Sequence, residues 1–311
     1  MENGKGQLEF RKFPFSDLIS SEYLYNTHSY LLEYDTKDLV RLQWKSQKGN
    51  TCSLTGVIRD SQFSSVPWGT FGGFEVEHGA GEDEIREFIA LVVSSAQQME
   101  LKELRIKLPP DFYLQKVPAL KQSLHCHQFV AVRSDINQHI EINSKQYRQR
   151  ITYNELKKLK KSENEGFTFA KLNRQHLPEA YRLIRDNRIR KGFPVSMTLQ
   201  TLDNMFEKLP QHYHLFGIYD NKKLIATGVS IRVNQASLYN FYHGDDQEYR
   251  VYSPVVMLLD GIYSYCQQSQ IETLDLGISS DQGELNKGLF VFKKNCGAIE
   301  SAKDILVRTF N

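Results

Sequence analysis

The spacing of hydrophobic and polar positions changes several times along the chain, and each spacing predicts a different element. Apolar runs at residues 39–44 and 51–59 predict two strands. Apolar side chains at helical spacing between residues 85 and 93 predict a helix, preceded by a polar and acidic stretch. Shorter apolar runs at 104–108 and 129–132 predict two more strands. The first half therefore alternates strands with helices.

The second half repeats this order of elements. Its pattern predicts three consecutive strands, then a helix, a strand, a second helix and a final strand. These elements are expected at residues 215–219, 224–232, 237–242, 254–268, 273–277, 289–294 and 305–307. The fold class predicted from this order is α/β (α+β), with a mixed sheet and helices on both of its faces.

Three pairs of residues mark the repeat. The members of each pair are 170 positions apart, and the pairs are Leu104 with Leu274, Phe71 with Phe241, and Cys126 with Cys296. A nearly constant offset is harder to obtain by accident than a shared order of elements, so we infer an internal structural repeat. The alternative is that any two α/β domains of similar size would align loosely.

A charged stretch at residues 153–166 separates the two halves and is typical of a helical connector. It places the boundary near residue 150, so one domain is expected over residues 1–150 and another over residues 151–311. The lysines of this stretch have two interpretations, because they could contact RNA phosphates or form the solvated face of a linker.

The composition indicates a folded protein, since 40% of the 311 residues are hydrophobic. The net charge of +2 removes the strong electrostatic case for a dedicated nucleic-acid binder, although a local basic patch is compatible with it. The longest apolar runs, at 88–93 and 255–259, are far shorter than the about 20 residues that cross a bilayer. The N-terminal residues lack the apolar core of a signal peptide. We therefore expect no membrane span and a cytoplasmic location.

The cysteines and histidines give no sign of a metal site. The four cysteines are scattered singly, without the Cys-x-x-Cys spacing of a zinc knuckle, and predict reduced thiols. The run His125-Cys126-His127 alternates too quickly for all three side chains to face one ion. We expect no metal.

Several segments carry a resemblance to a known family. In the second half they are residues 239–244 (YNFYHG), 249–254 (YRVYSP), 274–278 (LDLGI) and 288–298 (GLFVFKKNCGA), joined by residues 187–192 (NRIRKG) and 71–75 (FGGFE). They resemble the Fem-type family, the aminoacyltransferases that build peptidoglycan cross-bridges, together with their acetyltransferase-like relatives. The resemblance implies two tandem GNAT-like domains, each with a mixed, mostly antiparallel sheet flanked by helices.

The resemblance also implies a reaction site. Phe292 and Lys293 match a functionally important aromatic and lysine of the family, and such a cation is suited to hold a phosphate or the oxygen of a transferring carbonyl. Arg190, with Arg188 and Lys191, is implied to contact phosphates of the acceptor. The structural alternatives are a surface lysine whose stem covers Phe292, and an arginine that stabilises a helix C-terminus.

Three further residues of the second half are candidates. Tyr242 and His243 end a predicted strand, where side chains often face a ligand, and His243 is suited to accept a proton near neutral pH. A histidine beside a glycine is also typical of a turn. Asp275 lies between two leucines and points away from them, so it either orients Lys293 or caps a neighbouring backbone group.

The donor site departs from that of acetyl-CoA-dependent GNAT domains, which hold pyrophosphate with a Gln/Arg-x-x-Gly-x-Gly/Ala loop before the central helix. Residues 244–253 contain no such loop. In the first half, the glycines of residues 79–81 follow Val76 instead of Gln or Arg, and the carboxylates of residues 82–84 would repel a pyrophosphate. No cofactor is certain. Aminoacyl-tRNA or a carrier protein stays open as the donor, and free acyl-CoA is less favoured.

These observations predict an acyl- or aminoacyltransferase that moves its group to an amine acceptor in a cleft where the two domains meet. The acceptor is expected to be an anionic small molecule or a nucleotide-linked one. Substrate-assisted proton transfer is expected, because the sequence offers no convincing dedicated base. Two alternatives stay open: a non-catalytic protein that binds a nucleotide sugar or carrier-linked ligand, and an acyl-CoA-dependent N-acyltransferase.

Overall fold

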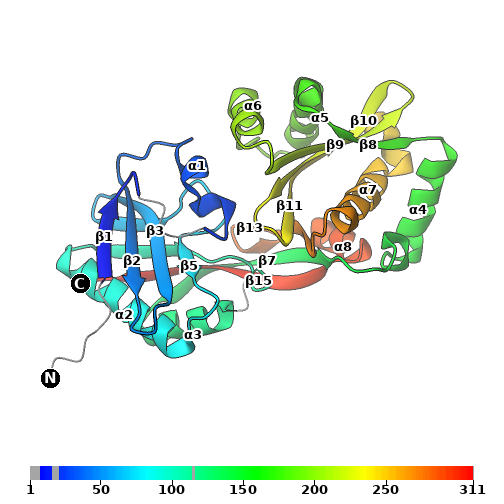
Figure 1. Cartoon of the computed structure of the whole chain (residues 1–311). Helices are drawn as coiled ribbons and strands as arrows, with labels where there is room; N and C mark the ends of the chain where they lie inside the picture. The colour runs from blue at the N-terminus through cyan, green and yellow to red at the C-terminus, as the bar shows by residue number, and fades with distance from the viewer. Residues whose placement is uncertain (1–7, 16–20, 114–115, 311) are drawn as a thin grey trace. The chain divides into compact units, whose positions relative to one another are not determined.

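The structure is a computed structural model that describes residues 8–15, 21–113 and 116–310. The chain divides into two compact units (Figure 1). The first contains Met1–Ile136, Gln282–Glu284 and Ser301–Asn311, and the second contains Asn137–Asp281 and Leu285–Glu300. These limits differ from the boundary near residue 150 that the sequence predicts, and the division into domains at that residue stays a prediction.

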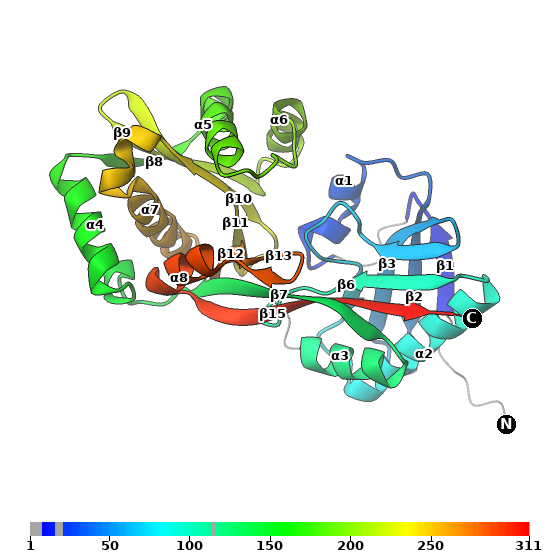
Figure 2. The same cartoon turned by 180° about the vertical axis from the view of Figure 1, so that it is seen from behind.

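The first unit is a sheet with the strand order β1-β2-β3-β4-β6-β15, in which β5 pairs with β3. Its strands are β1 (Leu8–Lys12), β2 (Leu39–Lys45), β3 (Thr51–Arg59), β4 (Gln62–Ser65), β5 (Phe74–Val76), β6 (Glu103–Lys107) and β15 (Ile299–Thr309), and its helices are α1 (His28–Leu31), α2 (Glu82–Gln98) and α3 (Val117–Cys126). Pairing is antiparallel except between β4 and β6, which are parallel. The helices α2 and α3 lie side by side on one face of this sheet (Figure 2).

Helix α2 shows how the sequence pattern builds this core. Ile85, Phe88, Ile89 and Val92 recur at helical spacing and are all buried against the sheet. At its start, the Glu84 carboxylate accepts a hydrogen bond from the Gly81 N–H at 2.9 Å, which is the half of a capping box that a glycine N-cap allows. Helix α2 therefore begins with its own carboxylate at its N-terminus.

The second unit has the strand order β7-β12-β11-β10-β9-β8. Its strands are β7 (Val130–Glu141, which enters from the first unit), β8 (Thr168–Leu172), β9 (Tyr213–Asp220), β10 (Lys223–Arg232), β11 (Ser237–Asp245) and β12 (Thr273–Ile278), with a small hairpin of β13 (Ser280–Asp281) and β14 (Glu284–Leu285). Its helices are α4 (Tyr153–Asn164), α5 (Leu177–Arg190), α6 (Leu199–Lys208), α7 (Pro254–Gln268) and α8 (Lys287–Asn295). As in the first unit, one pair is parallel, here β11 with β12. Helix α7 covers one face of the sheet, and α5 lies on the other.

Gly244 explains how closely α5 approaches β11. A Cβ atom at this position would lie 2.8 Å from the Cα of Ile184 and 2.9 Å from the carbonyl oxygen of Leu183. Only a residue without a side chain allows this contact between strand and helix. The contact brings the C-terminal turn of α5, with its arginines, to the end of β11.

The two units follow one plan but exchange their last strands. Each has an antiparallel meander, a helix, a strand parallel to the end of the meander, a second helix and a final strand. The final strand of the first plan, β7, pairs with β12 of the second unit, and the final strand of the second plan, β15, pairs with β6 of the first. The predicted repeat and mixed, mostly antiparallel fold are thus confirmed.

The sequence located most elements but underestimated the exchanged strands. β7 and β15 extend well beyond the predicted 129–132 and 305–307, because polar residues that alternate along them lack the apolar signal of a strand. Within the described ranges, no helix is both long and apolar enough to cross a membrane.

Candidate functional site

The second unit contains a split between its two parallel strands. β11 and β12 pair only from Ser237 with Thr273 to Tyr239 with Asp275, although both strands continue. On its other edge, β11 carries a bulge against β10, where the register shifts around Phe241. On β12, Gly277 has a φ of +74° and interrupts the pairing with β7. Parallel strands that diverge in an open sheet mark a common place for ligands.

Lys293 lies at this split. It comes from α8, only 4% of it is exposed, and its ammonium donates hydrogen bonds to the carbonyl oxygens of Gly277 (2.9 Å) and Ile278 (2.8 Å). Burial lowers the pKa of Lys293 to about 8, although the nearby Asp275 carboxylate acts in the opposite direction. An ammonium has three N–H donors, so these two carbonyls leave one for a ligand. The alternative of a surface lysine does not describe this residue.

Asp275 supports the same turn from the other side. Its Oδ1 accepts hydrogen bonds from the backbone N–H of Gly277 at 2.8 Å and from the Asn137 amide at 2.7 Å. It therefore caps a backbone group, which is one of the two roles that the sequence left open. Through its charge it also favours the protonated form of Lys293.

Tyr242 is buried and points to the loop between α5 and α6. Its hydroxyl accepts a hydrogen bond from the backbone N–H of Met197 at 3.1 Å and contacts the Ser196 hydroxyl. The guanidinium of Arg188 lies 5.4 Å from the centre of the Tyr242 ring. Tyr242 therefore fastens this loop.

His243 is half-buried and has basic neighbours. Desolvation, followed by repulsion from Lys191 and Lys293, lowers its pKa to about 4, while Asp245 opposes the shift. His243 is therefore neutral at pH 7 and a weak proton acceptor there. The expectation of a base near neutral pH is corrected to that of a neutral hydrogen-bonding side chain.

The end of α5 forms a basic group with Arg250. We define the basic group as Arg188, Arg190, Lys191 and Arg250. Arg188 lies in the last turn of α5, where an arginine can stabilise the helix C-terminus. It donates a hydrogen bond to the carbonyl of Pro194 at 2.8 Å. Loss of hydration lowers the pKa of Lys191, and repulsion from the three arginines of the basic group lowers it further, against the attraction of Asp245.

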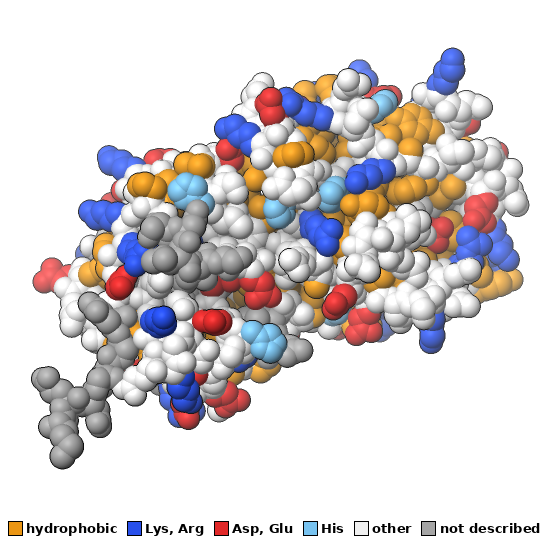
Figure 3. Space-filling view, in the orientation of Figure 1, with side chains coloured by type: hydrophobic (Ala, Val, Ile, Leu, Met, Phe, Trp, Pro, Cys, Tyr) orange, Lys and Arg blue, Asp and Glu red, His pale blue; other side chains and the backbone are white. Residues whose placement is uncertain are grey.

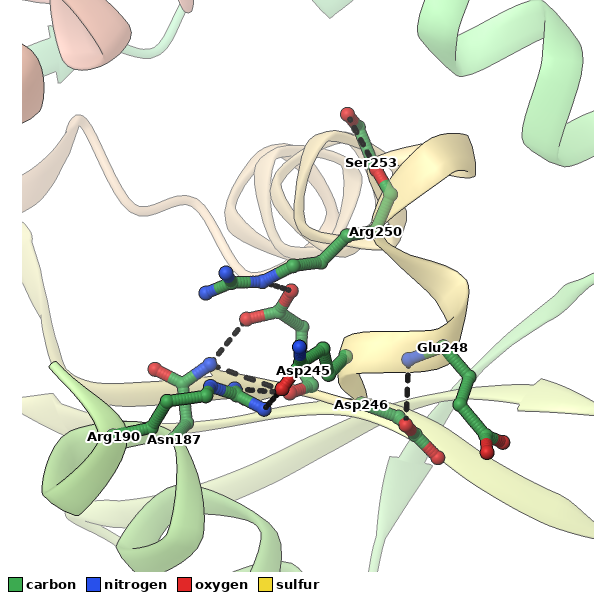
Figure 4. A network of polar contacts seen from close by, with 8 residues as sticks. Asn187, Arg190, Asp245, Asp246, Glu248, Arg250 and Ser253 are labelled. Carbon is green, nitrogen blue, oxygen red and sulfur yellow. Dashed lines mark hydrogen bonds and ion pairs between the residues drawn. The ribbon is translucent and has the colours of Figure 1, made fainter.

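One buried carboxylate organises the basic group (Figure 4). Asp245, at the end of β11, accepts from the amide of Asn187 and from Arg250 at 3.2 Å. Arg190 donates to its backbone carbonyl at 3.4 Å and to the Gln247 side chain at 3.0 Å. The Asp245 carboxylate thus bonds one cation of the basic group, Arg250, and attracts Lys191, whereas Arg190 reaches the backbone carbonyl of Asp245. The sequence analysis missed Asp245, and its only signal was an acidic residue three positions beyond the strand predicted at 237–242.

Phe292, on α8, is half-buried and packs against the hydrophobic core of the second unit. It precedes Lys293 on α8, so its contacts set the position of that helix. No ring contact joins the two residues among the interactions of the described residues.

The helix N-termini differ in what they offer to an anion. In the first unit, Glu84 occupies the start of α2, and its hydrogen bond from Gly81 is the main cause that lowers its pKa to about 2. In the second unit, α7 begins with Ser253 at a φ of +54° and Pro254, which has no N–H to donate. The structure therefore agrees with the lack of a pyrophosphate loop in the sequence.

Charged side chains are dispersed on one face of the molecule. On the face drawn in Figure 3, lysine and arginine side chains alternate with acidic and uncharged ones and form no continuous basic area. This face gives no support to the RNA-contacting interpretation of the lysines.

The family comparison places the split and the basic group in a known kind of domain. Residues 145–293 match the family model described as an acetyltransferase (GNAT) domain. Within the second half of the chain, these residues are similar to a GNAT domain. The match includes β11, β12, the basic group and Lys293. The predicted acyltransferase of the GNAT type is confirmed at this level.

Solved structures extend the likeness to both units. FemX is similar with a TM-score of 0.64 and 13% identity over 87% of this chain and 88% of that one. The C-terminal domain of a putative lysylphosphatidylglycerol synthetase from Agrobacterium fabrum gives 0.57 and 10%, over 87% and 84%. A tandem GNAT protein from the clavulanic acid biosynthesis pathway gives 0.50 and 10%, over 90% and 86%. At these identities the likeness shows the fold, and it confirms the resemblance to tandem GNAT and Fem-type structures. No curated protein shows significant sequence similarity to the chain.

Proposed function

We propose that this protein transfers an acyl or aminoacyl group to an amine acceptor at the split between β11 and β12. The observation that carries this proposal is the position of Lys293, a buried ammonium tied to the carbonyls of Gly277 and Ile278 where β12 leaves β11. A buried cation with one remaining donor is suited to an oxygen that gains negative charge during transfer.

The reaction begins with the neutral amine of the acceptor, which attacks the carbonyl carbon of the donor. A C–N bond forms, the carbonyl oxygen becomes an oxyanion, and the remaining N–H of Lys293 donates to it. The oxyanion then re-forms the carbonyl as the C–O or C–S bond to the carrier breaks. The proton of the attacking amine passes to the departing oxygen or sulfur, so Lys293 stays protonated throughout. Neutral His243 can accept a hydrogen bond from the amine without taking its proton.

The basic group supplies the anchor for an anionic acceptor. Arg190 and Arg250 are held by Asp245, and Arg188 and Lys191 add charge at the end of α5. Guanidinium groups bind phosphate through paired N–H donors, which suits a phosphate-bearing or nucleotide-linked acceptor. Tyr242 contributes by fixing the loop that follows the basic group.

The donor is an acyl or aminoacyl ester or thioester. The occupied N-terminus of α2 and the Pro254 start of α7 favour a donor carried on tRNA or a carrier protein over free acyl-CoA. FemX and the lysylphosphatidylglycerol synthetase domain share the fold, and their names fit aminoacyl chemistry. A protein that only binds a carrier-linked ligand is the second candidate, favoured by the starts of α2 and α7, which do not offer a pyrophosphate site.

A transfer assay tests the proposal. The full chain is incubated with radiolabelled acetyl-CoA or alanyl-tRNA and a UDP-linked peptide that bears a free amine, and labelled amide is measured. Transfer in the wild type that falls at least 100-fold in Lys293→Met supports the proposal. Binding of the UDP-linked amine without transfer from either donor supports the binding protein instead.

A further inference from the structure

Gln138 is a fully buried side chain on β7 that the reaction proposed above does not use. Both ends of its amide are hydrogen-bonded. The Nε2 donates to the carbonyl oxygen of Phe290 on the neighbouring helix α8 at 3.2 Å (Figure 2), and the Oε1 accepts from the hydroxyl of Ser279 at 2.6 Å. Ser279 is also fully buried and comes directly after β12. One side chain thus joins α8 to the segment that follows β12.

Gln138 lies opposite the irregular part of β12. Between the last two residue pairs of the β12–β7 ladder, β12 contributes Leu276 and Gly277, and β7 contributes Gln138 alone. This is the count of a β-bulge, and Gly277 has a φ of +74° in it. Successive side chains of a strand point to opposite faces, so Asn137 reaches Asp275 on one face while Gln138 reaches α8 on the other. Gln138 therefore faces the turn whose carbonyls hold Lys293.

The contacts of Gln138 close a ring that contains Lys293. The Lys293 ammonium bonds the two backbone carbonyls directly before Ser279. The Ser279 hydroxyl bonds Gln138, and Gln138 bonds the carbonyl of Phe290. Phe290 precedes Lys293 by three residues on α8, and residues at this spacing lie on the same side of a helix. The ammonium, the turn and the helix are therefore held together by one closed set of contacts.

The start of α8 is bound to the same segment. The Ser279 carbonyl accepts the N–H of Asn286 at 2.9 Å, and the Asn286 side chain caps α8 by accepting the N–H of Leu289 at 3.0 Å. A contact at one end fixes where a helix begins but leaves its direction free. The second contact, from Gln138 to the Phe290 carbonyl, lies further along α8 and fixes that direction. Gln138 thus restricts α8 one turn before Lys293.

We propose that Gln138 is a positioning residue for Lys293, and that it holds α8 against the turn at Gly277 so that the ammonium stays at the split. The inference deepens the proposed function, on which it rests, because it states what keeps the remaining N–H of Lys293 directed at the reacting oxygen. A misplacement of about 1 Å can slow a reaction by about 100-fold. Because Gln138 belongs to β7, the exchanged strand supplies a residue on which the reaction in the second unit depends.

The test uses three variants of the full chain. Gln138→Leu removes both hydrogen bonds of the amide. Ser279→Ala removes only the bond to the Gln138 Oε1, so it disturbs the core less and carries the test if Gln138→Leu does not fold. Ser162→Ala is the matched control, because Ser162 on α4 is also fully buried and its hydroxyl donates to the carbonyl of Tyr252 at 2.9 Å. The control loses a buried hydrogen bond to a backbone carbonyl without touching α8.

The first measurement is the titration of Lys293 by ¹³C NMR on protein labelled at the lysine Cε. The signal that Lys293→Met lacks identifies the residue. The charged or titratable groups that act with this ammonium are the Asp275 carboxylate on β12 and His243 on β11. Desolvation is the main cause of the low pKa of Lys293, so a loosened turn that admits water should raise this pKa from about 8 toward 10.5 in Gln138→Leu and Ser279→Ala. Ser162→Ala should leave it unchanged.

The second measurement is the transfer rate with the UDP-linked peptide as acceptor. We expect kcat to fall about tenfold or more in Gln138→Leu, with the KM for the acceptor within about twofold of the wild-type value. An unchanged pKa of Lys293 in both Gln138→Leu and Ser279→Ala overturns the positioning role, and so does an equal change in Ser162→Ala. A wild-type kcat in Gln138→Leu also overturns it while the proposed function stands. A wild type without transfer overturns the proposed function, whereas the NMR titration still decides whether Gln138 positions Lys293.

Discussion

Asp275 and Lys293 hydrogen-bond to the two backbone polar groups of the same residue, Gly277. The Asp275 carboxylate accepts the N–H of Gly277, and the Lys293 ammonium donates to the Gly277 carbonyl. The left-handed φ of Gly277 turns both groups toward these partners. The carboxylate and the ammonium thus stabilise one turn, and the Gly277 carbonyl in that turn fixes the position of the ammonium.

Replacement of Lys293 tests the role of its ammonium in the transfer step. Lys293→Met keeps the length of the side chain and removes the ammonium, and we expect kcat to fall at least 100-fold, as after loss of an oxyanion donor. Lys294→Met is the matched control, because the adjacent lysine is exposed. Single-turnover rates check the effect, and a Lys293→Met rate within threefold of the wild-type rate would contradict the role of the ammonium.

The lowered pKa of Lys293 predicts how activity depends on pH. The proposed chemistry uses the protonated amine, so kcat should fall as pH rises through about 8. Asp275 raises this pKa by its charge, so Asp275→Asn, which keeps an acceptor oxygen for Gly277, should move the fall to lower pH. The pH–rate profiles of the two proteins make the comparison. Coinciding profiles would show that Lys293 does not govern the rate.

The same pKa predicts a change in stability. In the unfolded chain Lys293 holds its proton up to about its ordinary pKa of 10.5, whereas the folded protein releases it near 8. The unfolded state then binds more protons, so the contribution of Lys293 to the free energy of unfolding rises between pH 8 and 10.5. Urea unfolding of the wild type and Lys293→Met across this range measures the difference, and a difference that does not change with pH contradicts the prediction.

Removal of the Tyr242 hydroxyl should loosen the loop that follows α5. Tyr242→Phe deletes the hydrogen bond from the Met197 N–H and the contact with Ser196, at a cost of about 1 kcal/mol. We expect faster hydrogen exchange at Met197 and a raised KM for the acceptor, with kcat little changed. Tyr219→Phe, on β9, serves as a control. An unchanged exchange rate at Met197 would show that the loop has other sufficient anchors.

The basic group predicts a salt-sensitive anion site. Arg190→Ala should weaken binding of UDP, used as a probe, by about tenfold or more and reduce the dependence of affinity on salt. Arg174→Ala is the control, because Arg174 is exposed on the same unit and already paired with Asp203 and Glu207. Titration at two ionic strengths measures both effects. Equal losses in the two variants would indicate a non-specific charge effect.

Local patterns were enough to predict four strands of the second sheet, β9 to β12, and its main helix, but not the edge strand β8. The predicted helix over residues 254–268 coincides with α7, Pro254–Gln268, because its proline start and apolar residues are all close in sequence. Partners distant in sequence escaped such reasoning. The loop held by Tyr242 is 45 residues away along the chain, and no spacing rule links the two.

The candidate site was predictable only in part. Lys293 was chosen from the family resemblance, and the sequence alone favoured an exposed lysine. Its burial depends on the backbone of Gly277, which a sequence pattern does not reveal. The low pKa of His243 could not be predicted from the sequence either, because it is set by desolvation and by cations that α5 and α8 bring near the ring.

The exchange of β7 and β15 has a consequence for any attempt to produce one half of the protein alone. A fragment cut at residue 150 would lack β15, so β6 would lose its antiparallel neighbour and expose a row of unsatisfied backbone groups. The complementary fragment would lack β7 beside β12. Each fragment carries the strand that the other lacks. Neither fragment should form its complete sheet alone, but the two should associate and complete both sheets when mixed.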